Sequence, residues 1–264
     1  MGQRTSEENE KIICKAYLTG DSSINEIAGR HGVSFATVNR VLTRNSISRE
    51  RSTGPRNKIK VNERFFEFLD TPEKAYWLGF IIADGSIHRH KNGGFHFALR
   101  LSTKDQNHLE MFKMAVESSH TIVTGKTHLK ATDKYYDYCA IKIVRKSFVN
   151  YLSQWFPFPK DLADDLLCHF VRGYFDGDGS WTIRRKQIAF SLRTAPEDLA
   201  LWLQNILIDR CDVDKTKIGF NTGAYRVGYE GNSQCLRIFR FMYEDGGPFL
   251  ARKYCKSSEH FNSL

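Results

Sequence analysis

Residues 77–86 read WLGFIIADGS, and residues 171–180 read VRGYFDGDGS. Both stretches place a glycine third, an aromatic residue fourth and Asp-Gly-Ser at the end. Each is followed by the same series of patterns: strand-like alternation, a helical segment, further strand-like alternation and a last helical segment. Repetition of a whole series of elements indicates an internal duplication. The chain from about residue 71 onward is therefore predicted to hold two pseudo-symmetric αββαββα units.

Small residues line one face of each repeated helix. Ala75, Gly79 and Ala83 are four positions apart, and Gly173 and Gly177 repeat this spacing in the second unit. Residues four apart share a helix face, so the two helices can pack backbone against backbone. Their C-terminal ends would then lie side by side.

An aspartate stands near the end of each of these helices, Asp84 in the first unit and Asp178 in the second. Gly85 and Gly179 follow them as expected C-terminal caps. A carboxylate at a helix C-terminus meets the negative end of the helix dipole, and a second carboxylate nearby adds repulsion. A divalent cation would relieve both effects, and hard carboxylate ligands suit Mg²⁺. A metal beside a basic surface predicts phosphodiester hydrolysis. The alternative is that the aspartates only cap turns, although their recurrence in a duplicated unit argues against it.

Both stretches resemble the motif of LAGLIDADG homing endonucleases, and the chain is similar to the single-chain form with two motifs. The resemblance extends over residues 72–261 and is closer in the second motif, since Ile82 stands in the first where the family often has an acid. It implies an α+β fold in which two αββαββα halves meet through the motif helices. Two antiparallel sheets would form a saddle on the major groove of double-stranded DNA. The resemblance also implies a metal site for Mg²⁺ or Mn²⁺ at Asp84, Asp178, Ala83 and Gly177.

Other family positions transfer to lysines and threonines. Segment 248–253 resembles the family segment with a basic active-site residue, which makes Lys253 the candidate in the second half and Lys160 its looser counterpart in the first. Such a lysine could polarise the attacking water or stabilise transition-state charge; a surface or phosphate-contact lysine is an equal alternative. Thr103 and Thr194 fall where the family places polar residues of a water network, and plain helix N-caps are the alternative.

Residues 1–45 carry the pattern of three short helices. Gly32 lies in a tight turn before the third helix, and Ser34 is the expected N-cap of that helix. The stretch resembles the helix-turn-helix of resolvase-like and repressor-like DNA-binding domains, while a protein-interaction module is the alternative. The candidate DNA contacts in this small all-α domain are Ser34, Thr37, Asn39 and Arg40.

Two further groups of basic residues are candidate DNA contacts. Residues 46–70 are expected to form a basic linker, in which Arg56 and Lys58 could meet phosphates or a minor groove; a merely solvated tether is the alternative. In the sheets, alternate residues point to one face, so one face can be basic. The strand candidates, some for bases and more for phosphates, are Arg89, Lys91, Arg100, Lys142, Arg184, Lys186, Arg193 and Arg226.

Composition supports a nucleic-acid partner. The 264 residues include 39 Lys and Arg against 30 Asp and Glu, for a net charge of +9. A basic chain favours nucleic acid over acidic small molecules, and a solvated basic surface is the alternative.

No apolar run reaches the ~18 residues of a membrane span, and the polar N-terminus is unlike a signal peptide. The expectation is a cytoplasmic monomer with no membrane partner, whose six cysteines are reduced and mostly buried.

Together these patterns predict a helix-turn-helix domain at 1–45, a linker at 46–70, and two units at 71–160 and 161–264. The predicted function is Mg²⁺-dependent double-strand cleavage of DNA at a long asymmetric target, and the resemblance implies short 3′ overhangs. One alternative is a LAGLIDADG-fold DNA-binding regulator or intron RNA maturase that does not cut. Another is a recombinase or transposase accessory factor, which the helix-turn-helix suggests. A zinc site at His88, His90 and His96 is disfavoured because no fourth ligand is evident.

Overall fold

The computed structural model of the chain describes residues 6–19, 24–47, 59–89, 94–130 and 132–264. The chain divides into two compact units, Met1–Lys58 and Ile59–Leu264. Within the described ranges no helix combines the length and the apolar character that a membrane crossing requires. All six cysteines carry free thiols, and four of them are buried, as expected: Cys139, Cys168, Cys211 and Cys235.

Three short helices form the N-terminal unit: α1 (Glu7–Leu18), α2 (Ile24–Arg30) and α3 (Phe35–Arg44). Ser34 is the N-cap of α3, because its hydroxyl accepts a hydrogen bond from the Thr37 N–H at 3.1 Å. Gly32 adopts a φ of +61° in the turn before α3, a conformation that glycine takes without strain. These features confirm the predicted helices. A shared apolar core joins them: Ile13, Ile27, Ala28, Val38, Val41 and Leu42.

The residues that lead into the second unit belong to its fold. Phe65 and Phe66 are 5% and 0% exposed, and the Trp155 indole donates a hydrogen bond to the Phe66 carbonyl at 2.7 Å. The Asn62 N–H donates to the Val116 carbonyl at 2.8 Å. The predicted linker is therefore wrong over residues 59–70. The basic residues of the segment suggested a solvated linker, but its two phenylalanines are buried in the second unit.

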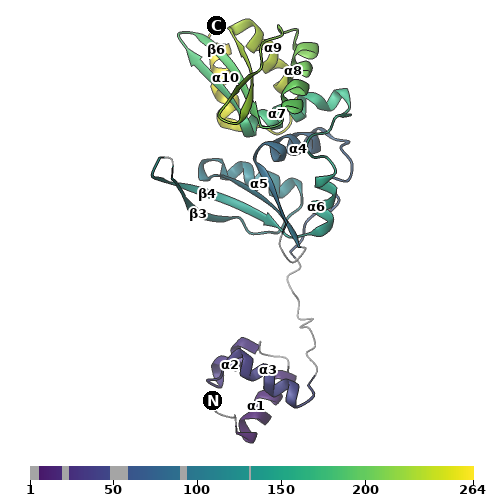
Figure 1. Cartoon of the computed structure of the whole chain (residues 1–264), viewed down its shortest axis with the longest axis vertical. Helices are drawn as coiled ribbons and strands as arrows, with labels where there is room; N and C mark the ends of the chain where they lie inside the picture. The colour runs from purple at the N-terminus through teal and green to yellow at the C-terminus, as the bar shows by residue number, and fades with distance from the viewer. Residues whose placement is uncertain (1–5, 20–23, 48–58, 90–93, 131) are drawn as a thin grey trace. The chain divides into compact units, whose positions relative to one another are not determined.

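The second unit holds two αββαββα halves, which meet at α4 and α7 (Figure 1). The first half consists of α4 (Pro72–Asp84), β1 (Gly85–Arg89), β2 (Phe95–Ser102), α5 (Gln106–Ala115), β3 (Val123–Leu129), β4 (Lys134–Ile143) and α6 (Lys146–Ser153). The second consists of α7 (Leu167–Asp178), β5 (Gly179–Arg184), β6 (Gln187–Thr194), α8 (Glu197–Cys211), β7 (Gly219–Asn221), β8 (Ala224–Glu230) and α9 (Asn232–Tyr243). Short 3₁₀ turns, η1 (Thr103–Asp105) and η2 (Asp164–Leu166), precede α5 and α7. A further helix, α10 (Ala251–Asn262), was not expected from the sequence.

Each half contains one antiparallel four-stranded sheet, and the two sheets have the same strand order: β1-β2-β4-β3 and β5-β6-β8-β7. Their registers also match, since Leu99 pairs with Gly85 and Ile141 while Leu192 pairs with Gly179 and Val227. The buried residues of β2 and β6 alternate with exposed ones, and the buried face packs against the helices. The other face of each sheet, called here the solvent face, is open. The predicted α+β fold with two pseudo-symmetric halves is confirmed.

Glycines allow α4 and α7 to pack backbone against backbone. A Cβ atom on Gly79 would overlap the carbonyl oxygen of Phe170, and one on Gly173 would overlap the carbonyl oxygen of Tyr76. Main chain cannot yield to a side chain at this distance, so only glycine fits at either position. The predicted small-residue faces are confirmed, and they bring the C-terminal ends of the two helices together.

Candidate active site and nucleic-acid interface

Asp84 and Asp178 are the last residues of α4 and α7. Both side chains are exposed to solvent. A Cβ atom on Gly177 would lie 3.5 Å from the Asp84 carboxyl group and would overlap the Ala83 methyl group, so the two helix ends touch. Gly85 and Gly179 are the C-caps, as expected, but their backbone is extended and passes directly into β1 and β5. The structure thus brings the four predicted residues of the metal site together.

The electrostatics around these carboxyl groups favour a cation. Although Asp84 reaches solvent, the protein packed around it and then the charge of Asp178 raise its pKa to about 6. Burial also raises the pKa of Asp178. The carbonyl ends of both helices add further negative potential. A divalent cation would offset these effects, and two accessible carboxylates are the hard donors that Mg²⁺ or Mn²⁺ takes. The residues present therefore fit such an ion.

Lys253 lies beside this pair and is 7% exposed. Its ammonium group donates hydrogen bonds to the carbonyl oxygens of Phe175, Asp176 and Gly177 at 2.7, 2.7 and 3.0 Å. These bonds use all three ammonium protons, and burial lowers the Lys253 pKa to about 8. Its positive charge lowers the pKa of both site aspartates. Lys253 therefore reaches the predicted site and also holds the C-terminal turn of α7.

The other residues transferred from the family motif lie in different surroundings. Lys160 is exposed, with its Nζ atom 5.8 Å from the centre of the Phe158 ring. The two predicted lysines are therefore not equivalent. Neither predicted threonine is an N-cap, because Ser102 caps the turn at Thr103 and Pro196 precedes α8 after the buried Thr194.

A chain of buried hydrogen bonds runs behind the site and crosses between the halves. The Asp176 carboxylate accepts the Tyr76 hydroxyl at 2.8 Å and the Leu250 N–H at 2.7 Å. The Tyr76 hydroxyl hydrogen is used in the bond to Asp176. The His108 Nε2–H must therefore donate the hydrogen bond to the Tyr76 oxygen, at 2.8 Å. Burial raises the pKa of Asp176 to about 7 and lowers the pKa of His108 to about 4. The histidine is therefore neutral at pH 7.

A second contact between the halves is the ion pair of Arg252 and Asp105. The Arg252 guanidinium donates to both carboxylate oxygens, with Nε at 2.9 Å and Nη2 at 3.0 Å from their respective acceptors. This ion pair could not be predicted from the sequence, because nothing there relates positions so far apart. For Asp176 there was a signal: it is the acid that Ile82 replaces in the first motif.

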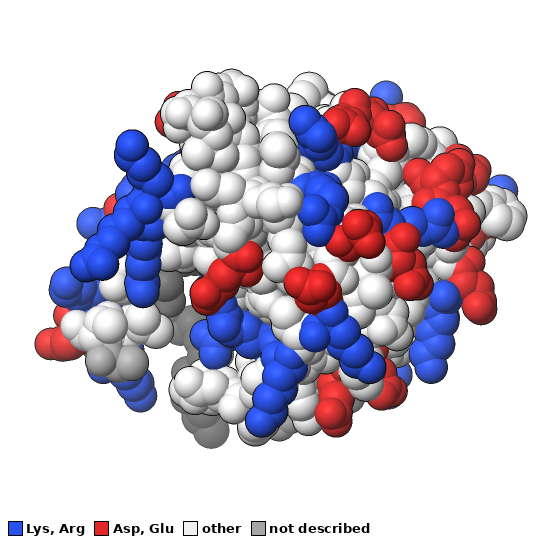
Figure 2. Space-filling view, turned by 90° about the horizontal axis from the view of Figure 1, so that it is seen from above, with Lys and Arg blue, Asp and Glu red and all other residues white. Residues whose placement is uncertain are grey.

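The solvent faces of the sheets carry most of the predicted basic strand residues. Arg100 and Lys142 are exposed on the first sheet, and Arg184, Arg193 and Arg226 on the second. Figure 2 shows Lys and Arg side chains gathered at its left edge, while acidic and basic residues mix over the right of the view. These five predicted residues therefore lie on the solvent faces of the sheets.

The remaining basic candidates differ in placement. Arg89 pairs with Phe95 and shares the helix-packed side of the first sheet with Ile87, with its guanidinium 4.9 Å from the Phe95 ring centre. The alternation of the strand thus turns it away from the solvent face, contrary to expectation. Lys186 lies in the turn between β5 and β6. The candidates Arg56, Lys58 and Lys91 lie outside the described residues.

The candidates in the N-terminal unit lie on or near α3. Arg40 and Ser34 are exposed, and Thr37 and Asn39 are half-buried. The Ser34 hydroxyl serves the helix cap and also meets the Thr37 hydroxyl at 2.9 Å. Arg40 is therefore the most open of the four to a partner.

The histidines considered for zinc do not assemble such a site in the described residues. His88 and His96 pair across β1 and β2 with stacked rings, and His90 lies outside the described residues. A different cluster, Cys168 with His169 and Asp245, has the spacing of metal ligands. There, however, the Arg172 guanidinium donates to His169 Nδ1 at 2.8 Å. The proton of the neutral ring is then on Nε2, so neither nitrogen offers a lone pair.

The fold and the paired aspartates define a class: a pseudo-symmetric α+β protein with two open sheets and a candidate metal site where its central helices meet. Solved structures specify the class. The homing endonuclease I-WcaI bound to its DNA recognition sequence has a TM-score of 0.54 at 13% identity, covering 75% of this chain and 89% of that one. A mesophilic variant of the homing endonuclease I-DmoI gives 0.52 at 12% identity, covering 75% and 99%. The chain has the LAGLIDADG fold, which confirms the resemblance of its two motifs.

The I-SmaMI LAGLIDADG homing endonuclease bound to cleaved DNA adds a TM-score of 0.51 at 13% identity, covering 73% of this chain and 88% of that one. No family model matches the chain. In sequence, it is similar to a DNA polymerase of Thermococcus litoralis, with 27% identity over 174 residues, or 64% of this chain. That segment is only 9% of the polymerase, so the chain matches a small part of a much longer protein.

Proposed function

We propose that the protein is a metal-dependent, site-specific endonuclease of double-stranded DNA. The observation that carries the proposal is the meeting of Asp84 and Asp178 at the joined ends of α4 and α7. Two carboxylates held together at negative helix ends are unfavourable unless a cation joins them. The DNA-bound homing endonucleases of the same fold support the same assignment.

Asp84 and Asp178 would hold Mg²⁺ or Mn²⁺ beside the scissile phosphates. When bound, such an ion would supply Lewis acidity for activating water and for offsetting negative charge on the phosphate oxygens. Lys253 keeps the last turn of α7, and with it Asp178, in place through its bonds to the preceding carbonyls. The Gly177 carbonyl already accepts a hydrogen bond from Lys253, and the two carboxylates are the negatively charged donors of the site.

The solvent faces of the two sheets are the proposed DNA surface. Antiparallel strands fit the major groove, and the exposed arginines and lysine of both faces supply phosphate and base contacts. The sheets differ in sequence, so the target need not be a palindrome. The N-terminal unit would bind the flanking DNA through α3, with Arg40 among its contacts, and raise affinity without adding chemistry.

The test is a cleavage selection from a randomised DNA library in Mg²⁺, with the wild type and Asp178→Asn run in parallel. The proposal expects a long asymmetric site that only the wild type cuts, with short 3′ overhangs. DNA enriched by binding, with no Mg²⁺-dependent cutting by either protein, would instead support the non-cleaving regulator. A covalent protein–DNA adduct would support the recombinase alternative.

A further inference from the structure

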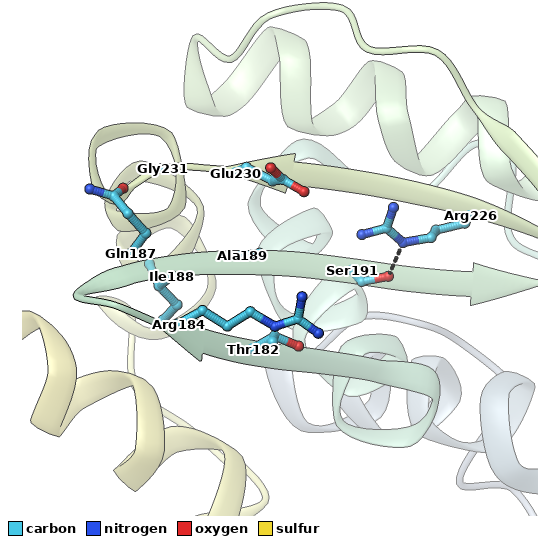
Figure 3. Close-up of a pocket in the computed structure, with 9 residues that line it drawn as sticks. All are labelled: Thr182, Arg184, Gln187, Ile188, Ala189, Ser191, Arg226, Glu230 and Gly231. Carbon is cyan, nitrogen blue, oxygen red and sulfur yellow. Dashed lines mark hydrogen bonds between the residues drawn. The ribbon is translucent and has the colours of Figure 1, made fainter.

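The solvent face of the second sheet is hollowed between β5, β6 and β8. The hollow has a volume of about 260 Å³. Its floor is made by small side chains, among them Ala189 and Ser191 of β6, while Arg184 and Arg226 reach over it from β5 and β8 (Figure 3). Two guanidinium groups and one carboxylate, that of Glu230, line the hollow. The positive groups outnumber the negative one, so the hollow favours a ligand edge that accepts hydrogen bonds.

The Arg226 side chain is held in one orientation over this hollow. Its Nε–H donates to the Ser191 hydroxyl at 3.0 Å, as Figure 3 shows. Its guanidinium lies flat over Gly228, since a Cβ atom on that glycine would come within 3.1 Å of Cζ and Nη2. Within the described residues, neither Nη1 nor Nη2 has a hydrogen bond or an ion pair. The N–H groups of Nη1 and Nη2 therefore remain available to a ligand, on a guanidinium that Ser191 holds in place.

A fixed fork of two N–H donors matches the O6 and N7 acceptors that guanine presents in the major groove. A phosphate contact needs charge but no such orientation, and a lysine would serve it equally well. We propose that Arg226 reads a guanine in the half-site covered by the second sheet, with Ser191 as its positioning residue. The inference rests on the proposed function in one respect, that the solvent face meets DNA.

The first sheet lacks this device. Because Leu99 and Leu192 occupy equivalent positions, the register equates Ala98 with Ser191, Ala140 with Arg226, and Lys142 with Gly228. The first sheet thus has alanines at the positions of Arg226 and Ser191. It has a lysine at the position of Gly228, over which the Arg226 guanidinium lies. A guanine read by an arginine held in this way is therefore expected in only one half of the target.

The test is a binding selection with randomised duplex DNA, without Mg²⁺ or Mn²⁺, using the full chain and its variants. The wild type should enrich guanine at one position, and Arg226→Ala should lower that preference roughly 5- to 150-fold while the other positions stay unchanged. Arg226→Lys keeps the charge but not the planar fork, so it should weaken the preference. Ser191→Ala should weaken it partly, and Ser191→Thr should restore it. Arg240→Ala removes an exposed arginine from α9, on the helix-packed side, and should leave the profile unchanged.

An Arg226→Ala variant that keeps the guanine, or that weakens all sequences evenly, overturns the inference and makes Arg226 a phosphate contact. A wild type that enriches no sequence overturns it as well. Because the readout is binding, it separates this inference from the proposed catalysis. If the guanine depends on Arg226 but no DNA is cut in Mg²⁺, the endonuclease proposal fails while the reader stands.

Discussion

Buried ionisable residues lie on the protein side of the candidate site. Arg172 and Asp176 are both 0% exposed, and Lys253 is 7% exposed. Each is held by hydrogen bonds to main chain or to a neighbouring side chain. Removing one partner of a buried polar group leaves the other without compensation, which costs more than losing an exposed charge. The residues behind the aspartates are thus expected to matter for stability and for placing the carboxylates.

Replacing Lys253 by methionine should lower the free energy of unfolding by roughly 1–3 kcal/mol, because three carbonyls of α7 lose their donor. Lys160→Met is the matched control, since Lys160 is exposed, and should change stability by no more than about 0.5 kcal/mol. Urea unfolding followed by tryptophan fluorescence measures both. All four tryptophans lie in residues 59–264, so the signal reports the second unit alone. Equal stabilities for the two variants would contradict this role of Lys253.

His108 should make stability depend on pH in a defined window. Its pKa is about 4 in the folded protein and 6.5 as an ordinary value, so between these the unfolded chain binds a proton that the folded one does not. Unfolding free energy should therefore fall as pH drops from 6.5 toward 4. Asp176, whose pKa is raised, contributes the opposite slope.

The stability of the wild type is compared with that of His108→Gln at each pH. Both proteins contain Asp176, so its contribution cancels in the difference. Measured by urea unfolding at each pH, the wild-type stability minus that of the variant should shrink by up to about 3 kcal/mol across the window. Parallel stability curves for the two proteins would show that His108 is not held neutral.

At the scale of elements, the joined helices α4 and α7 determine the architecture. The small-residue faces of these helices, and the strands that follow them, could be predicted from the sequence. Helix and strand geometry fixes the spacing of residues that share a face. Helix α10 was not, since its sequence has no clear apolar stripe. The packing of residues 59–70 also escaped prediction, because burial of Phe65 and Phe66 depends on partners distant in sequence. The paired aspartates followed from the duplication, whereas the Arg252–Asp105 pair required the folded structure.

Gly173→Ala tests the close approach of these two helices. The new methyl group would meet the Tyr76 carbonyl, which is main chain, and should destabilise the second unit by about 1–3 kcal/mol or more. Gly219→Ala on β7 is the control, because its Cβ atom meets nothing within 4 Å. Thermal unfolding of both variants measures the difference. An unaltered melting temperature for Gly173→Ala would contradict the backbone packing described for α4 and α7.

At the scale of the whole molecule, two units of different size share the proposed work. The second unit holds both sheets and both aspartates, while the described residues of the first unit include three helices. Under the proposed function, the chemistry belongs to residues 59–264 and residues 1–58 add DNA affinity. The two tasks should therefore be separable by truncation.

A fragment of residues 59–264 should fold with the stability of the second unit and cut the same position with lower affinity. A fragment of residues 71–264 should lose several kcal/mol, because it lacks the two buried phenylalanines, each contributing about 1.5–3 kcal/mol. Unfolding and cleavage of the two fragments check this. Equal stability would mean that residues 59–70 are a linker after all, and a shifted cut position would mean that the N-terminal unit directs it.

A metal site shared by Asp84 and Asp178 is tested by cleavage of the selected DNA site, with both strands labelled, by the wild type, Asp84→Asn and Asp178→Asn in Mg²⁺. Binding of the same DNA is measured in parallel. We expect that the wild type cuts both strands, that chelation of the metal stops the cutting, and that each variant binds the DNA without making the double-strand break. Full cutting by either variant, or cutting that persists without metal, would contradict a metal site shared by the two aspartates.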